Sequence, residues 1–109
     1  MGPEEIEQLP KKIYDEKEKQ MNTYLEVLDL ETKQMKPLET EGNAASISGK
    51  NTDARELLFS QFMQSNHPEY TTLVLKRDEL KNKAKKEGLM AEYYENQLKA
   101  AWIVHGIIL

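Results

Sequence analysis

Few side chains in this sequence could carry out chemistry, and their spacing does not assemble a reactive site. The two histidines, His67 and His105, lie far apart in unlike surroundings, one before a proline and one among apolar residues. A zinc site needs three or four ligands, and the chain contains no cysteine to complete one. Four serines have no histidine and acid arranged near them as in hydrolases: Ser46, Ser48, Ser60 and Ser65. We therefore expect neither an enzyme nor a metal or cofactor site.

A glycine–lysine pair, Gly49-Lys50, suggests a phosphate-binding loop, but its neighbours do not fit. The Walker motif requires Gly at position 44 and Ser or Thr at position 51. The sequence has Ala44 and Asn51 at these positions. We therefore reject a nucleotide-binding loop.

Six basic residues gather in the C-terminal half of the chain: Lys76, Arg77, Lys81, Lys83, Lys85 and Lys86. A helix would spread them over more than one face. The favoured interpretation is a solvated helix flank that pairs with the acidic first part of the chain. The alternative is a strip that follows the phosphates of a nucleic acid. No aromatic residue between Lys76 and Lys86 could stack on a base, so nucleic acid is the less favoured partner.

These bases belong to a long helix predicted over residues 68–108. From Pro68 onward, steps of three and four residues meet mostly apolar or small side chains, which is the spacing of a helix packed lengthwise on other helices. We call these positions the seam: Tyr70, Leu73, Arg77, Leu80, Ala84, Glu87, Ala91, Tyr94, Leu98, Ala101, His105 and Ile108. Gly88 comes shortly after Lys85 and Lys86, and basic residues followed by glycine often mark the end of a helix. The seam, however, continues with the same spacing on both sides of Gly88. We therefore predict one continuous helix.

Two shorter helices and a linker are predicted before this one. Residues 10–36 form the first helix, bounded by Pro10 and Pro37, because proline lacks a backbone N–H and disfavours helix at the preceding residue. Its apolar stripe recurs every seven residues, at Tyr14, Met21, Leu28 and Met35. Five more residues widen this stripe: Ile13, Tyr24, Leu25, Val27 and Leu30. Residues 37–51 are rich in Gly, Ser and Asn and read as a linker. Residues 52–65 form the second helix, with Asn51, Thr52 or Asp53 as N-cap.

The composition agrees with a helical protein that has a thin core. The chain has 109 residues, of which 39% are hydrophobic and 31% are charged, with only 5 Gly and 4 Pro. We predict a single all-α domain, residues 1–109. It should form an elongated antiparallel helical hairpin or three-helix bundle with a coiled-coil-like seam.

Charge, cysteine content and targeting signals indicate which partners and which cellular compartment to expect. The net charge of −4 argues mildly against a general nucleic-acid binder. The absence of cysteine fits a reducing compartment. The first 20 residues are polar where a secretory signal would be apolar, and no apolar run is long enough to span a membrane. We expect a cytoplasmic protein without a membrane segment.

The last ten residues are apolar nearly all round, and a chain of thin helices has little bulk to bury them. We therefore predict a homo-oligomer, by default a dimer, and a protein partner. The expected interface residues are Tyr94, Leu98, Ala101, Trp102, His105 and Ile108. Two interpretations of Trp102 stay open: an interface anchor, or a core residue packed against Phe59, Phe62 and Met63.

The order of the parts resembles a known group of proteins. Ser48-Gly49-Lys50-Asn51 with Arg55, and then His67-Pro68-Glu69-Tyr70, lie between two long charged helices. This pattern resembles small uncharacterised all-helical proteins of phages and prophages, often encoded near recombination or replication genes. The resemblance implies a non-enzymatic accessory protein that works through self-association and partner binding in the host cytoplasm. The alternatives are an inhibitor of a host defence nuclease, as anti-CRISPR proteins are, or a nucleic-acid-binding accessory of recombination or replication.

Overall fold

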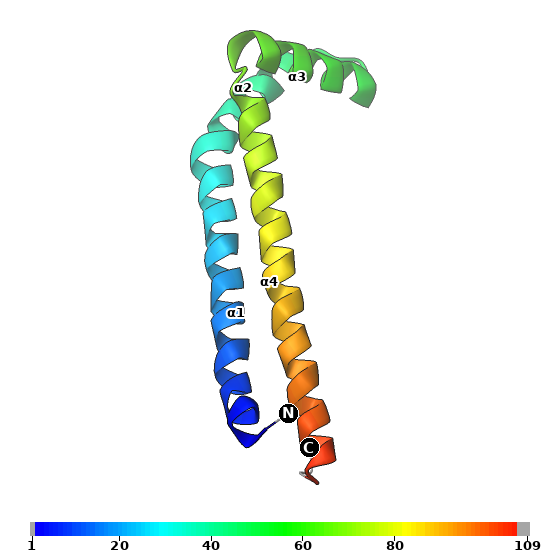
Figure 1. The fold of residues 1–109 in the computed structure, drawn as a ribbon. Coiled ribbons are helices and arrows are strands. Elements are labelled where there is room, and N and C mark those ends of the chain that lie inside the picture. Colours follow the sequence, from blue (N-terminus) through cyan, green and yellow to red (C-terminus); the bar gives the residue numbers. More distant parts are fainter. Residues whose placement is uncertain (1, 107–109) are drawn as a thin grey trace. The chain divides into compact units, whose positions relative to one another are not determined.

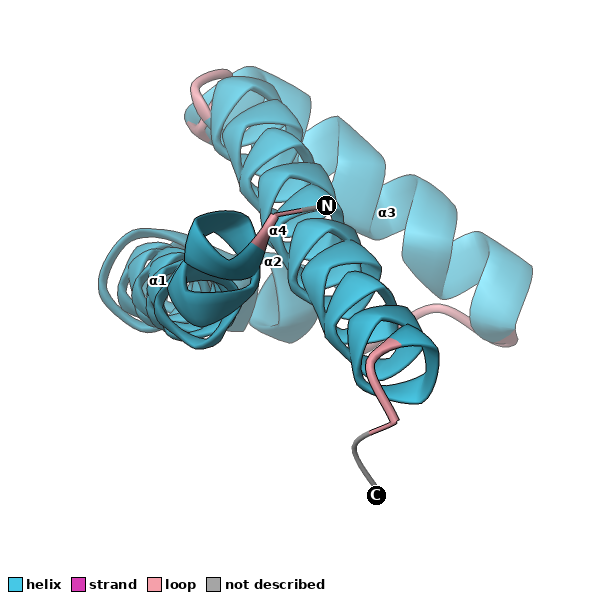
Figure 2. Cartoon of the chain, turned by 60° about the horizontal axis from the view of Figure 1, so that its bottom comes forward, coloured by secondary structure: helices cyan, strands magenta, loops and turns pink. Residues whose placement is uncertain are grey.

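Every regular element among residues 2–106, which the computed structural model describes, is a helix (Figures 1 and 2). The elements are α1 (Pro3–Asp29), a π-helical segment η1 (Leu30–Met35), α2 (Lys36–Ser46), α3 (Thr52–Asn66) and α4 (Tyr70–Val104). No strand occurs in this part of the chain. The all-α prediction is therefore confirmed.

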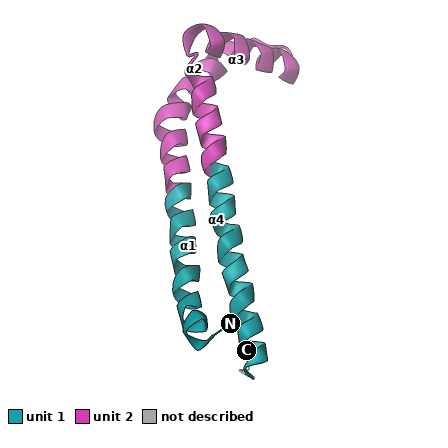
Figure 3. Cartoon of the chain, in the orientation of Figure 1, with its two compact units in different colours: residues 1–24, 81–109 teal, residues 25–80 magenta. Residues whose placement is uncertain are grey.

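The chain forms two compact units, where the sequence suggested one domain (Figure 3). Unit 1 comprises residues 1–24 and 81–109, so that it joins the first part of α1 to the last part of α4. Unit 2 comprises residues 25–80 and is continuous in sequence.

Unit 1 is an antiparallel helical hairpin. Lys17 on α1 pairs with Glu95 on α4 at 2.7 Å, whereas Thr23, further along α1, hydrogen-bonds to Glu87, which lies earlier on α4. The seam of α4 faces this contact: Ala84, Ala91 and Ala101 are buried, and the seam positions between them are half-buried. The predicted seam is thus confirmed from Ala84 to Ala101. Ile108 lies outside the described residues.

The prediction that α4 continues through Gly88 is also confirmed, since the helix runs without a break from Tyr70 to Val104. It begins two residues later than expected. His67, Pro68 and Glu69 form a tight turn, closed by a hydrogen bond from the Tyr70 amide to the His67 carbonyl at 3.0 Å.

The helix predicted over residues 52–65 is α3, and its bounds agree with the prediction to within one residue. Asn51 is its N-cap, since the Asn51 side chain accepts a hydrogen bond from the Ala54 amide at 2.8 Å.

The prediction that the first helix spans residues 10–36 was wrong at both ends. Helix α1 begins at Pro3 and contains Pro10. Proline removes one backbone hydrogen bond from a helix, but Leu9 beside it is only 2% exposed. Burial of this leucine therefore outweighs the missing bond.

The prediction of a linker over residues 37–51 was wrong as far as Ser46, because the chain stays helical past Pro37. The π-helical segment before Pro37 explains how. In it the Lys36 amide donates to the carbonyl of Glu31, five residues earlier, which widens the turn where a proline ring would clash in an α-helix. Leu30 and Met35, at the two ends of this segment, are both buried.

Packing also holds α2 in a sequence that looked like a loop. Gly42 of α2 is buried against α3, and a Cβ atom there would come within 2.5 Å of the Phe59 ring. The missing side chain lets the two helices approach closely. Tertiary contact thus overrides the weak helix propensity of this glycine-containing segment.

The apolar stripe predicted for the first helix is confirmed only in part. Val27, Leu30 and Met35 are buried and Ile13 is half-buried, but the other five positions are exposed: Tyr14, Met21, Tyr24, Leu25 and Leu28. In unit 1 the buried side of α1 instead carries Leu9 and Thr23, together with the half-buried Gln20. The polar members of this side hydrogen-bond to α4, so that a hydrophobic pattern does not reveal it.

Candidate interaction surface of the C-terminal helix

The structure separates the predicted interface residues into two groups. Tyr94 and Leu98 are half-buried and Ala101 is buried, because these three are seam positions that face α1 within unit 1. Trp102 is half-buried and His105 is exposed. Trp102 belongs to unit 1 whereas Phe59, Phe62 and Met63 belong to unit 2, and both interpretations of this tryptophan stay predictions. Ile108 is not among the described residues.

Sequence reasoning missed a second row of positions on the opposite side of α4. We call it the outward face and define it as Leu89, Glu92, Tyr93, Asn96, Lys99, Ala100 and Ile103, all of them exposed. Its apolar members are largely in solvent, with exposed fractions of 55% for Leu89, 54% for Tyr93 and 70% for Ile103. Steps of three and four residues from Leu89 also meet this row. The sequence pattern did not single it out, because the seam on the same helix contains more apolar residues at helical spacing.

Local contacts fix the aromatic side chains near this face. The Gln97 side-chain amide donates to the Tyr93 hydroxyl at 2.9 Å, across one helical turn. The Tyr93 and Tyr94 rings lie 5.6 Å apart between centroids, and the Lys12 ammonium lies 5.6 Å from the Tyr94 ring centroid. Tyr94 is therefore directed to α1, whereas Tyr93 is held at the surface.

A shallow apolar pocket of about 360 Å³ lies beside the outward face. It is lined by Gln97, Ala100, Ala101, Val104 and His105. Val104 is 79% exposed at its rim. Small side chains at Ala100 and Ala101 leave this room, which is the kind of recess that receives a large side chain from a partner.

A salt bridge fixes the hairpin behind this surface. The hydrogen bond and positive charge of Lys17 lower the pKa of the Glu95 carboxyl below its ordinary value. The other ion pairs of α1 in unit 1 join neighbours on that helix, Lys11 with Asp15 and Lys19 with Glu16. The Glu16 carboxylate raises the pKa of Lys19 by hydrogen bonding and by its charge.

The six predicted nucleic-acid contacts do not pair with α1 in the described structure. Arg77 is half-buried and its one ion pair is with the adjacent Asp78, at 3.3 Å. The five lysines are exposed, and none takes part in an ion pair within residues 2–106: Lys76, Lys81, Lys83, Lys85 and Lys86. The interpretation that the basic residues pair with the acidic first helix is therefore not supported.

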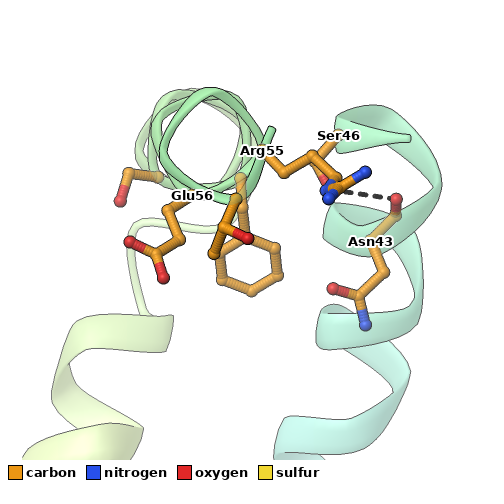
Figure 4. A pocket seen from close by; sticks show the side chains of 7 residues that line it. Asn43, Ser46, Arg55 and Glu56 are labelled. Carbon is orange, nitrogen blue, oxygen red and sulfur yellow. Dashed lines mark hydrogen bonds between the residues drawn. The ribbon is translucent and has the colours of Figure 1, made fainter. Parts of the chain in front are cut away.

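Unit 2 has a polar pocket of about 550 Å³ between α2 and the first turns of α3 (Figure 4). Its lining residues are Asn43, Ser46, Thr52, Arg55, Glu56, Phe59 and Ser60. The Ser46 hydroxyl donates to the Asn43 carbonyl at 3.0 Å, so that this serine caps its own helix. The lining residues include no histidine or lysine, and the carboxylate of Glu56 is the one side chain among them that could accept a proton from a hydroxyl.

Carboxylates on α2 bind the polar groups at the turn before α4. The Tyr70 hydroxyl donates to Glu39 at 2.8 Å, and the His67 ring bonds to Glu41. The Phe59 ring packs edge-on against Tyr70 with 6.0 Å between centroids. These contacts join α2, α3 and the start of α4 within unit 2, so that the Tyr70 hydroxyl and the His67 ring have a structural role.

The described part of the chain has neither a metal-binding cluster nor a membrane-spanning helix. Residues 2–106 contain no cluster of three or more His, Cys, Asp or Glu side chains arranged to hold a metal ion. None of the described helices combines the length and the apolar character needed to cross a membrane.

Comparison with protein-family models, with curated proteins and with solved structures gave no match.

Proposed function

We propose that this chain is a helical interaction protein that works by self-association through the outward face of α4. The observation that supports this most is the exposure of Leu89, Tyr93 and Ile103 in one row on a helix whose other side already packs on α1. Apolar side chains aligned along one helix face mark contact surfaces more often than isolated exposed ones do. A second copy of the chain is the partner that this surface fits best.

The helical hairpin of unit 1 suits this function. Its salt bridge and its seam hold α4 against α1, so that the outward face is presented on a supported helix. A surface that is already ordered loses less conformational entropy on binding.

Sedimentation velocity over a wide range of protein concentrations tests the proposal. We expect the wild-type chain to sediment faster as concentration rises. The double variant L89Q/I103Q, which replaces two apolar side chains of the outward face, should stay monomeric at concentrations about tenfold higher. Far-UV circular dichroism should show unchanged helix content, because both positions are exposed.

A matched control lies in unit 2. Leu57 and Ile47 are exposed by 59% and 80%, so that L57Q/I47Q makes the same chemical change at similarly exposed positions. This control should associate like the wild type. A wild-type chain that is monomeric at every concentration, or a control that dissociates as readily as L89Q/I103Q, would refute self-association through α4.

A second candidate function is nucleic-acid binding, favoured by the exposed lysines of unit 1 that lack a carboxylate partner. We propose Lys81, Lys83, Lys85 and Lys86 as its contacts. Replacing all four by Gln should then abolish a gel shift of DNA or RNA, and the wild-type affinity should fall steeply as salt rises. Equal binding of the variant and the wild type, or no shift for either at low salt, would exclude this function.

A further inference from the structure

We propose that the outward face of α4 pairs in antiparallel orientation with the same face of a second copy, about a twofold axis near Asn96. This inference rests on the proposed self-association and adds its partner geometry. The face extends over four helical turns from Leu89 to Ile103 with the three-and-four spacing of a helix-packing seam. A twofold contact requires a surface that complements itself, so that each residue of the face must meet a compatible residue of the second copy.

The outward face is nearly symmetric about position 96. In an antiparallel pair, a residue that precedes the axis lies opposite one that follows it by the same number of positions. Leu89 and Ile103 are placed evenly about Asn96, so that two large aliphatic side chains would meet. Asn96 itself would meet its copy at the axis, and its amide can both donate and accept a hydrogen bond there.

Charges on the face agree with the same axis. Glu92 lies four positions before Asn96 and Lys99 lies three positions after it, on the same edge of the face. In an antiparallel pair each would therefore lie within about 1.5 Å along the helix of the level of its counterpart of unlike charge in the second copy. Both are exposed, and neither takes part in an ion pair within residues 2–106. A parallel pairing in register would instead place Glu92 opposite Glu92 and Lys99 opposite Lys99. Charge complementarity therefore selects the antiparallel orientation.

The sizes of the remaining side chains also match. Tyr93 lies three positions before Asn96 and Ala100 lies four positions after it, on the other edge of the face, so that a large ring would lie next to a methyl group of the second copy. The pocket of about 360 Å³ beside Ala100 gives this ring space. Gln97 holds the Tyr93 hydroxyl from its own chain, which orders the ring before the copies meet. The small residue and the adjacent pocket make the hole into which the tyrosine packs.

Charge reversal tests the orientation. E92K or K99E alone places like charges opposite each other twice in an antiparallel dimer, and should weaken association roughly tenfold. The double variant E92K/K99E restores both unlike pairs and should associate like the wild type. A parallel dimer predicts no loss for the single variants, because reversal only exchanges one like-charge pair for another.

Crosslinking gives a second readout, since the wild-type chain has no cysteine. With a short bifunctional maleimide, N96C should crosslink to itself near the axis. L89C and I103C should each crosslink poorly alone, and should crosslink to each other when the two variants are mixed. Self-crosslinking of L89C and I103C as efficient as that of N96C would overturn the antiparallel arrangement.

The two proposals fail in different ways. If L89Q/I103Q dissociates the protein but E92K and K99E do not, self-association through α4 stands and the antiparallel register is wrong. If the wild-type chain does not self-associate at any concentration, both are wrong. Dissociation by each single reversal with recovery in the double variant supports both, provided that circular dichroism shows equal helix content throughout.

Discussion

Tyr70 shows how one residue can make stability depend on pH. Partial burial and the hydrogen bond to Glu39 raise the pKa of Tyr70 to about 12, from an ordinary value of 10.0. Both causes favour the protonated hydroxyl in the folded state. Because the folded pKa lies above the unfolded pKa, the stabilisation is fully present below pH 10 and is lost as pH rises to about 12.

We therefore expect the free energy of unfolding to fall more steeply between pH 10 and pH 12 in the wild type than in Y70F. Phenylalanine keeps the ring contact with Phe59 and removes only the hydroxyl. Urea denaturation at several pH values measures the difference, and the other titrating groups are common to both proteins. Parallel pH profiles for the two would show that the Tyr70 hydroxyl does not contribute.

Gly88 governs how α1 and α4 approach each other in unit 1. The Gln20 side chain donates to the Ala84 carbonyl at 3.0 Å, and a Cβ atom at Gly88 would collide with the Gln20 amide nitrogen. The glycine thus leaves space for a polar contact between the helices. Its poor helix propensity is the cost of that space.

G88A should accordingly gain less stability than the roughly 1 kcal/mol by which alanine favours an α-helix over glycine. The obstructing atom is at the end of the flexible Gln20 side chain, which can move aside but then loses its hydrogen bond to the Ala84 carbonyl, at a cost of about 1 kcal/mol. In the Q20A background this bond is already absent, and G88A should then stabilise by about 1 kcal/mol. A larger gain in the Q20A background than in the wild type is the expected result of a double-mutant cycle measured by urea denaturation.

G88A that stabilises the wild type as much as it stabilises Q20A would contradict this account. It would mean that Gln20 moves aside without loss. Circular dichroism of all four proteins should show equal helix content, because the helices are retained and only their contact changes.

The two long helices differ in how far sequence could predict them. Helix α4 was predictable because its seam keeps one phase over many turns, as Ala84, Ala91 and Ala101 show. Helix α1 was not, because its contact side in unit 1 carries Gln20 and Thr23 while Tyr14 and Met21 face solvent. Hydrophobic periodicity cannot identify a contact side made by hydrogen bonds and small residues.

The wrong linker prediction has a similar cause. Proline and glycine usually interrupt helices because of their local backbone preferences. At Pro37 and Gly42 the chain stays helical, because packing outweighs those preferences. The π-helical segment buries Leu30 and Met35, and Gly42 contacts Phe59 on another helix. Three of the predicted interface residues, Tyr94, Leu98 and Ala101, lie on the inner side of α4, whereas the surface proposed from the structure lies on its exposed side.

At the scale of the whole molecule, the described chain combines a unit that is continuous in sequence with one that is not. Unit 2 uses residues 25–80, and its contacts form within that segment. Unit 1 joins residues 64 positions apart, as in the hydrogen bond between Gln20 and Ala84. Closing a long loop costs more conformational entropy than closing a short one, and a compact unit 2 shortens the loop that unit 1 must close.

This division sets an order of events during synthesis. A ribosome exposes the chain from its N-terminus, so that all residues of unit 2 emerge before the second half of α4 does. Unit 2 can therefore fold while residues 1–24 still lack their partner, and Leu9 stays in water until residues 81 onward emerge. A nascent chain from which only the residues up to Leu80 have emerged would display this unpaired helix, whereas release of the remaining residues would bury it.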